Sequence, residues 1–138
     1  MNLGIDRTKT TYPIKTMLEA GMPVEFSSDA PATAWADPVK PFVGIKSAVT
    51  RVAYDGTNTG DAERIDVETT IEFYTREAQV VTRIPKVGQL KEGYHADFIV
   101  LNKDILEIPA NEIDQISVEE TYLKGKVVFQ RETISSIN

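Results

Sequence analysis

The spacing of apolar residues changes along the chain, and this change limits the possible folds more than any other feature. Between residues 66 and 83, apolar side chains recur at the interval of an α-helix, and Asp66 precedes them as a candidate N-cap. The members of this stripe are Val67, Ile71, Tyr74, Ala78 and Val81. Beyond Lys86, residues 96–101 form a compact apolar run that is typical of a strand. The sequence therefore predicts a mixed α and β chain whose last third is rich in strands.

Shorter patterns fill the upstream half of the chain. Residues 12–21 read as a short helix, because a proline stands near the start and Gly21 follows as a stop. Residues 22–28 are too short for a second helix and are predicted to form a strand. Residues 42–54 carry apolar side chains at helical spacing, and the intervening segment 28–41 contains three prolines, which predicts a loop.

The end of the chain has the pattern of a β-hairpin. Residues 117–123 and 127–130 read as strands, and they flank Lys124-Gly125-Lys126, which has the composition of a tight turn. Together with the run at 96–101, they predict a C-terminal antiparallel sheet.

Charge and hydropathy disfavour several classes of partner. The 138-residue chain has a formal net charge of -6 and a pI near 4.8, which argues against binding to a phosphate backbone or to an anionic membrane surface. No stretch approaches the roughly 18 consecutive apolar residues of a membrane span. We therefore expect no nucleic-acid partner, no membrane partner and a cytoplasmic location.

Side chains that could hold a metal are scarce. The chain has no cysteine and one histidine, His95. It therefore offers neither a thiolate nucleophile nor the several imidazoles from which a catalytic zinc site is usually built. Its chemistry must use oxygen and nitrogen groups.

Several short motifs follow one another in a recognisable order. In the upstream half they are Tyr12-Pro13-Ile14, Gly21-Met22-Pro23-Val24, Ser28-Asp29-Ala30-Pro31, Asp37-Pro38 and Ala48-Val49-Thr50-Arg51. Downstream they are Ile65-Asp66-Val67-Glu68, Tyr74-Thr75, the run from Gly88 through Ala96-Asp97 to Leu101, and Thr121 to Val128. In order and spacing, these motifs resemble amidohydrolase family 3 of the metal-dependent hydrolases. The resemblance covers nearly the whole chain.

The resemblance implies an α+β chain that corresponds to the end of a larger enzyme. Residues 1–85 would form the C-terminal remnant of a (β/α)8 barrel, namely its last helix-strand-helix units. Residues 86–138 would supply the strands of a C-terminal β-sandwich. A whole barrel takes about 250 residues, so the chain is expected to be a truncated part of a longer enzyme or a separately encoded remnant.

Asp29 is the candidate catalytic residue. In the family, the aspartate at the end of barrel strand eight binds the metal and hydrogen-bonds the hydrolytic water, so the resemblance assigns Asp29 as metal ligand and general base. From the residues alone, an ordinary turn in which Asp29 bonds its own backbone is the alternative. In a strand, Glu25 would share the face of Asp29, but at roughly 13 Å it is too distant to share a metal.

Four other residues have a functional and a structural interpretation. Trp35 could contact substrate from the loop after Asp29, or it could plug the space beneath that loop. His95 is expected to be structural or surface-exposed, and Asp97 to be a turn acid. Arg51 could pair with a substrate carboxylate, although a charged helix end is more often solvated.

The expected function is that of an incomplete hydrolase. The family also needs a His-x-His pair and further ligands that this sequence does not contain, so we expect a divalent metal, zinc above others, in the complete enzyme and none bound by this chain alone. The complete enzyme would act on carbon-nitrogen bonds other than peptide bonds in a small amide-type substrate, and the isolated chain would be inactive. The alternative is a non-catalytic remnant domain that self-associates, and a homo-oligomer is expected.

Overall fold

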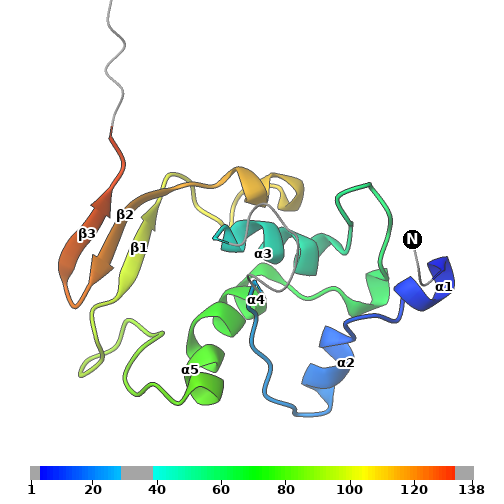
Figure 1. Cartoon of the computed structure of the whole chain (residues 1–138), viewed down its shortest axis with the longest axis horizontal. Coiled ribbons are helices and arrows are strands. Elements are labelled where there is room, and N and C mark those ends of the chain that lie inside the picture. The colour runs from blue at the N-terminus through cyan, green and yellow to red at the C-terminus, as the bar shows by residue number, and fades with distance from the viewer. Residues whose placement is uncertain (1–3, 29–38, 133–138) are drawn as a thin grey trace, which may run out of the picture.

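The computed structural model describes residues 4–28 and 39–132 and shows helices followed by a small sheet (Figure 1). The α-helices are α1 (Ile5–Thr8), α2 (Ile14–Glu19), α3 (Pro41–Thr50), α4 (Val67–Tyr74) and α5 (Arg76–Thr82). Two 3-10 helices, η1 (Asp61–Glu63) and η2 (Ala110–Gln115), lie in the connections. The strands are β1 (Phe98–Leu101), β2 (Val118–Leu123) and β3 (Lys126–Gln130). The mixed α and β class predicted from the sequence is confirmed, whereas its barrel origin stays a prediction.

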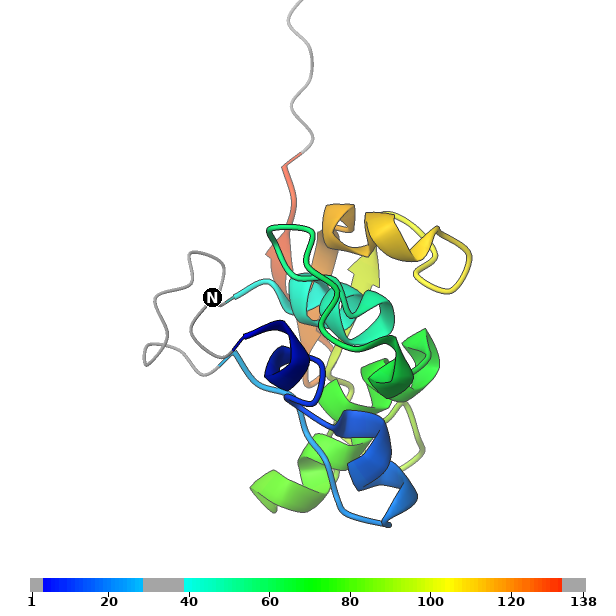
Figure 2. The same ribbon diagram turned by 90° about the vertical axis from the view of Figure 1, so that its right-hand side faces the viewer.

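Helix α3 is the central element, because it contributes to two separate apolar clusters. Ala48 packs with Ile14, Val24, Ile65 and Phe73 in the first cluster. The second cluster contains two residues of α3 and three of the later chain, namely Phe42, Ile45, Ile105, Ile113 and Ile116. Figures 1 and 2 show η2 on one side of α3 and α4 on the other. The predicted domain boundary near residue 85 stays a prediction, and the second cluster draws residues from both sides of it.

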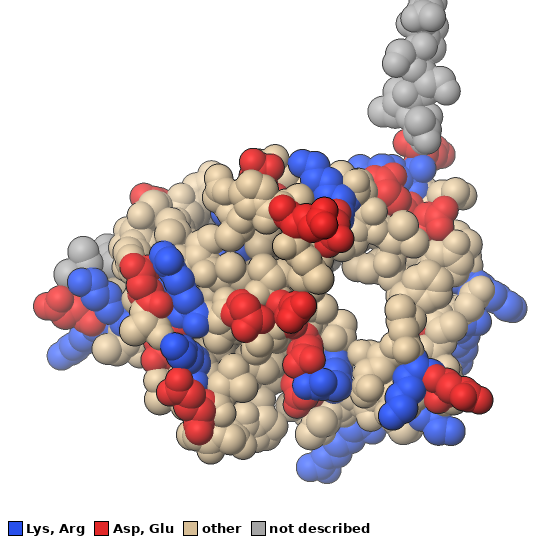
Figure 3. Space-filling view, turned by 180° about the vertical axis from the view of Figure 1, so that it is seen from behind, with Lys and Arg blue, Asp and Glu red and all other residues tan. Residues whose placement is uncertain are grey.

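The three strands form an antiparallel sheet in the order β1-β2-β3. Phe98 lies opposite Tyr122 with their rings stacked at 4.3 Å, and Thr121 lies opposite both Ile99 and Phe129. The predicted hairpin is confirmed, with Lys124 and Gly125 as its turn at positive φ. In the space-filling view, an opening lies between part of the sheet and the helices, and basic and acidic side chains are interspersed on this face (Figure 3). Leu101 of β1 and Val118 of β2 nevertheless pack against the second cluster.

Three predicted elements differ from the structure. Residues 22–28 do not form a strand, because a strand needs a neighbour to complete its hydrogen-bond ladder and every strand described lies within residues 98–130. The predicted helix at 42–54 ends at Thr50, where Arg51 takes a left-handed φ of 53°.

The predicted long helix from 66 to 83 is divided at Thr75. The Thr75 hydroxyl donates to the Ile71 carbonyl at 2.8 Å, a local bond that bends helices. The Thr75 carbonyl also lies so close to Gly88 that a side chain at Gly88 would collide with it. The predicted apolar face is therefore confirmed in α4, where Val67, Ile71 and Tyr74 pack against the second cluster. In α5 the prediction is wrong for Val81, which is exposed.

None of the helices in the described part of the chain is long and apolar enough to cross a bilayer.

Candidate active site

Both residues that were predicted to form the site fall in the segment 29–38. Asp29, the expected metal ligand and general base, and Trp35, the expected substrate contact, lie outside the described residues. The structure does describe residues 22–28, which precede Asp29 in the sequence, and the hollows that Ser27 and Ser28 help to line.

Residues 24 to 28 approach Asp29 with their apolar side chains turned toward the helices. Val24 is buried in the first cluster, and the Phe26 ring meets the rings of Phe73 and Tyr74 edge-on at 5.3 and 5.5 Å. The Phe26 amide donates to the Phe73 carbonyl at 3.4 Å. Val24 and Phe26 therefore both pack against the helices, while residues 22–28 form no strand.

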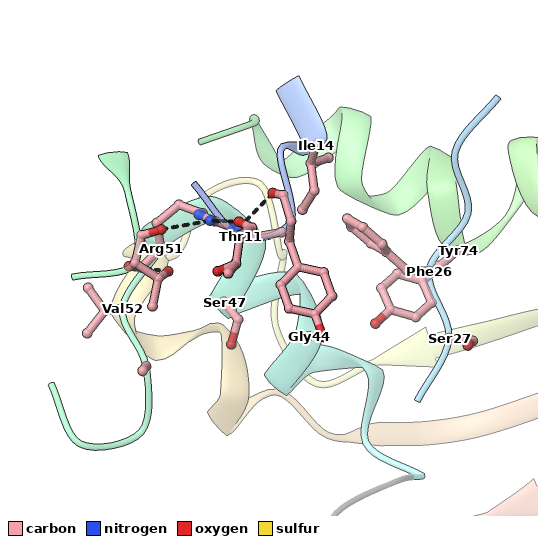
Figure 4. A pocket seen from close by; sticks show the side chains of 13 residues that line it. Thr11, Ile14, Phe26, Ser27, Gly44, Ser47, Arg51, Val52 and Tyr74 are labelled. Carbon is pink, nitrogen blue, oxygen red and sulfur yellow. Dashed lines mark hydrogen bonds between the residues drawn. The ribbon is translucent and has the colours of Figure 1, made fainter. Parts of the chain in front are cut away.

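A hollow of about 340 Å³ lies beside this segment (Figure 4). Helix α3 provides part of its lining, and the loops at 11–12 and 52–59 provide more. Its lining among the described residues is Thr11, Tyr12, Ile14, Phe26, Ser27, Gly44, Ser47, Ala48, Arg51, Val52, Ala53, Thr59 and Tyr74. Figure 4 shows Arg51 and Val52 at one end and Phe26, Ser27 and Tyr74 at the other.

A second hollow of about 940 Å³ adjoins the first. The two share several lining residues, including Ser27, Ser47 and Tyr74. The larger one also includes Ser28, the residue immediately before Asp29. Both hollows are therefore lined in part by the residues that directly precede Asp29 in the sequence.

Arg51 is buried, with 5% of its surface exposed, and it joins two loops to the end of α3. Its Nη2 donates to the carbonyls of Thr11 at 2.7 Å and Thr59 at 2.8 Å. Its Nε donates to Gly60 at 3.3 Å and its Nη1 to Tyr12 at 3.4 Å. The expectation of a solvated helix end was wrong. The sequence did not reveal that Arg51 is buried and hydrogen-bonded, because its acceptors are backbone carbonyls. The one sequence feature that pointed to these contacts was an arginine followed by a loop dense in turn residues.

Electrostatics agree with a structural role for this guanidinium. Burial lowers the pKa of Arg51, and the charge of Glu63 partly opposes that shift. Glu63 itself accepts hydrogen bonds from the Thr16 amide at 3.0 Å and from the Thr16 hydroxyl at 2.5 Å, and these bonds lower the pKa of Glu63. The segment that precedes Asp29 is thus tied to the later loops at two places.

Tyr74 lies against α3 at Gly44. A Cβ at Gly44 would collide with the Tyr74 hydroxyl, so only glycine allows this approach. Burial raises the pKa of Tyr74, so the hydroxyl keeps its proton at neutral pH. The hydroxyls of Tyr74, Ser27 and Ser47 form no hydrogen bond to another residue in the described part of the chain.

The described residues do not form a metal centre. Among residues 4–28 and 39–132, no group of three or more histidines and carboxylates is arranged to hold an ion. The His95 amide donates to the Lys86 carbonyl at 2.8 Å within a loop. Asp97 accepts from the Lys124 amide at 2.7 Å, which fits its expected role as a turn acid.

Comparisons with known proteins agree on one family. A family model described as the amidohydrolase family matches residues 1–129. The chain is 32% identical over 133 residues to YtcJ of Bacillus subtilis (strain 168), a protein named as an amidohydrolase. The aligned residues make up 94% of this chain and 24% of the relative. It is 26% identical over 121 residues to the N-substituted formamide deformylase of Arthrobacter pascens, covering 87% of this chain and 22% of the relative.

One solved structure has a similar fold. The 5-methylcytosine deaminase of Klebsiella pneumoniae, solved with phosphonocytosine, aligns over 88% of this chain and 28% of the deaminase, with a TM-score of 0.58 and 20% identity. The chain thus spans about a quarter of the length of the relatives that it matches.

Proposed function

Because the chain belongs to the amidohydrolase family, we propose that it forms part of a metal-dependent hydrolase of carbon-nitrogen bonds other than peptide bonds, with Asp29 as metal ligand and general base. The observation that carries the proposal is the family match over residues 1–129, which includes Asp29 and the residues that line the two hollows. The name of the deformylase relative describes cleavage of a substituted formamide, which is a carbon-nitrogen bond.

The proposal gives this chain one oxygen ligand and leaves the others to the rest of the enzyme. The described residues alone do not fit a metal site, and under this proposal the remaining ligands would come from outside them. A bound divalent metal, zinc in our expectation, would polarise the amide carbonyl and promote ionisation of water. The Asp29 carboxylate would accept the proton of the attacking water and return it to the leaving nitrogen.

The substrate class can be tested on the complete reading frame that contains these residues. We expect metal-dependent hydrolysis of N-substituted formamides and simple amides, loss of activity with a chelator, and recovery when zinc is restored. Dipeptides should not be cleaved. Chelator-resistant turnover, or turnover of dipeptides alone, would contradict the proposal.

A second candidate is a non-catalytic domain that self-associates through its sheet. All five residues of β3 are exposed, and three of them, Val127, Val128 and Phe129, are apolar. This is an unusually apolar surface for an edge strand. Sedimentation of the 138-residue chain decides this candidate: concentration-dependent association that a charge at Val128 abolishes would favour it, and a monomer at all concentrations would exclude it.

A further inference from the structure

We propose that the 340 Å³ hollow is the subsite for an uncharged, largely apolar group of the substrate, and that Arg51 is the positioning residue that holds its walls together. This inference rests on the proposed function and adds to it the character of the substrate group that does not react.

The walls of the hollow come from segments far apart in the sequence. Thr11 and Tyr12 belong to the loop before α2, and Thr59 belongs to the loop before η1. Arg51 donates hydrogen bonds to the backbone of all three, and its own position is fixed at the end of α3. Without the guanidinium, these loops would lose the donor that both of them share.

The lining favours a ligand without charge. Arg51 is the one charged side chain among the described residues that line the hollow, and its guanidinium is already directed to backbone carbonyls. The other walls are apolar or carry hydroxyls. A charged group entering this space would lose hydration without gaining a counter-ion, which disfavours its binding.

The hydroxyl groups supply specificity for a neutral polar atom. Ser27, Ser47 and Tyr74 line the hollow, and none of their hydroxyls is engaged by another described residue. Each can donate to a carbonyl or an ether oxygen and accept from an N–H. The rings of Phe26 and Tyr74 offer a flat surface to an aromatic or aliphatic group.

The sequence connects the hollow to the proposed reacting residue. Ser27 lines the hollow and precedes Asp29 by two residues, a span of at most about 7 Å of backbone. One small molecule can therefore place its amide at Asp29 and its substituent in the hollow.

The first test measures binding to the 138-residue chain, without metal or turnover. Formanilide is a neutral aromatic formamide, and 4-formamidobenzoate is its charged counterpart. By ligand-detected NMR titration, we expect formanilide to bind at least tenfold more tightly than the charged compound. Ser47→Met fills the hollow from α3 and should weaken formanilide binding at least tenfold. The matched control is Thr50→Met, one turn along α3 and outside both linings, which should leave binding within twofold.

The second test examines Arg51. Arg51→Met should weaken formanilide binding at least tenfold and increase amide exchange at residues 11–12 and 59–60, while Arg51→Lys should restore part of both. If Arg51→Met does not fold, Ser47→Met still decides the subsite. Unchanged binding in Ser47→Met, or equal binding of the charged compound, would overturn the inference.

Failure of this inference can be told apart from failure of the proposed function. If Asp29→Asn leaves hydrolysis intact while Ser47→Met abolishes formanilide binding, the catalytic assignment is wrong and the subsite stands. If Asp29→Asn abolishes hydrolysis while Ser47→Met binds normally, the subsite is wrong and the catalytic assignment stands.

Discussion

At the scale of single residues, two side chains stabilise the fold through hydrogen bonds to the backbone: Asp66 caps α4, and Arg51 joins two loops to the end of α3. Asp66 was predicted as an N-cap from its place before an apolar stripe, and its carboxylate does accept from the Thr69 amide at 2.7 Å. Arg51 was not recognised, because its acceptors at Thr11 and Gly60 come from loops that only the folded chain brings together. Caps depend on neighbours in sequence, whereas buried guanidinium sites depend on tertiary structure.

The Asp66 cap leads to a pH-dependent prediction. Asp66→Ala should lower the free energy of unfolding by about 1 kcal/mol at neutral pH, because Thr69 loses its acceptor. The Thr69 hydrogen bonds lower the pKa of Asp66 below its ordinary 3.8. The contribution of the cap is therefore complete above that ordinary value and is lost as pH falls through the lower pKa of the folded state.

Urea denaturation at several pH values measures this contribution. Glu68→Ala is the control, an exposed acid of the same turn that does not cap the helix, and it should cost less than about 0.5 kcal/mol. An Asp66→Ala effect no larger than that of Glu68→Ala would show that the cap does not stabilise α4.

At the scale of elements, the differences between prediction and structure arise where two segments meet. The apolar period continued through residue 83, yet the helix divides at Thr75, where Gly88 packs against the backbone. Residues 22–28 had strand composition, but a strand also requires a partner strand. Hydrophobic period predicts which face of an element is apolar and does not predict which neighbour covers it.

The contact at the helix division can be tested with two glycines. Gly88 and Gly56 both have positive φ, at 75° and 82°. A Cβ at Gly88 would meet the Thr75 carbonyl, whereas a Cβ at Gly56 meets nothing within 4 Å. Gly56→Ala should cost about 1 kcal/mol from backbone strain alone, and Gly88→Ala should cost clearly more. Equal losses in thermal denaturation would contradict the close approach.

At the scale of the whole molecule, the proposed metal site takes one ligand, Asp29, from this chain, and the residues that the structure describes contain no group of three or more histidines and carboxylates arranged to hold an ion. The motifs that resemble the family were readable because they keep their order along the chain, and the family match over residues 1–129 agrees with them. The hollows and the Arg51 contacts were not predictable, because they form between α3 and loops distant in sequence. These contacts hold the walls of the hollow that Ser27 lines, two residues before Asp29 in the sequence.

The central claim is that Asp29 carries the chemistry, and one comparison tests it most directly. In the complete reading frame, Asp29→Asn should lower kcat/KM for a formamide substrate at least about a hundredfold, as expected when a general base is removed. Asp104→Asn alters an exposed loop aspartate that accepts from the Leu106 amide, and it should leave kcat/KM within twofold of the parent. An Asp29→Asn enzyme that retains bound metal and is as active as Asp104→Asn would contradict the account.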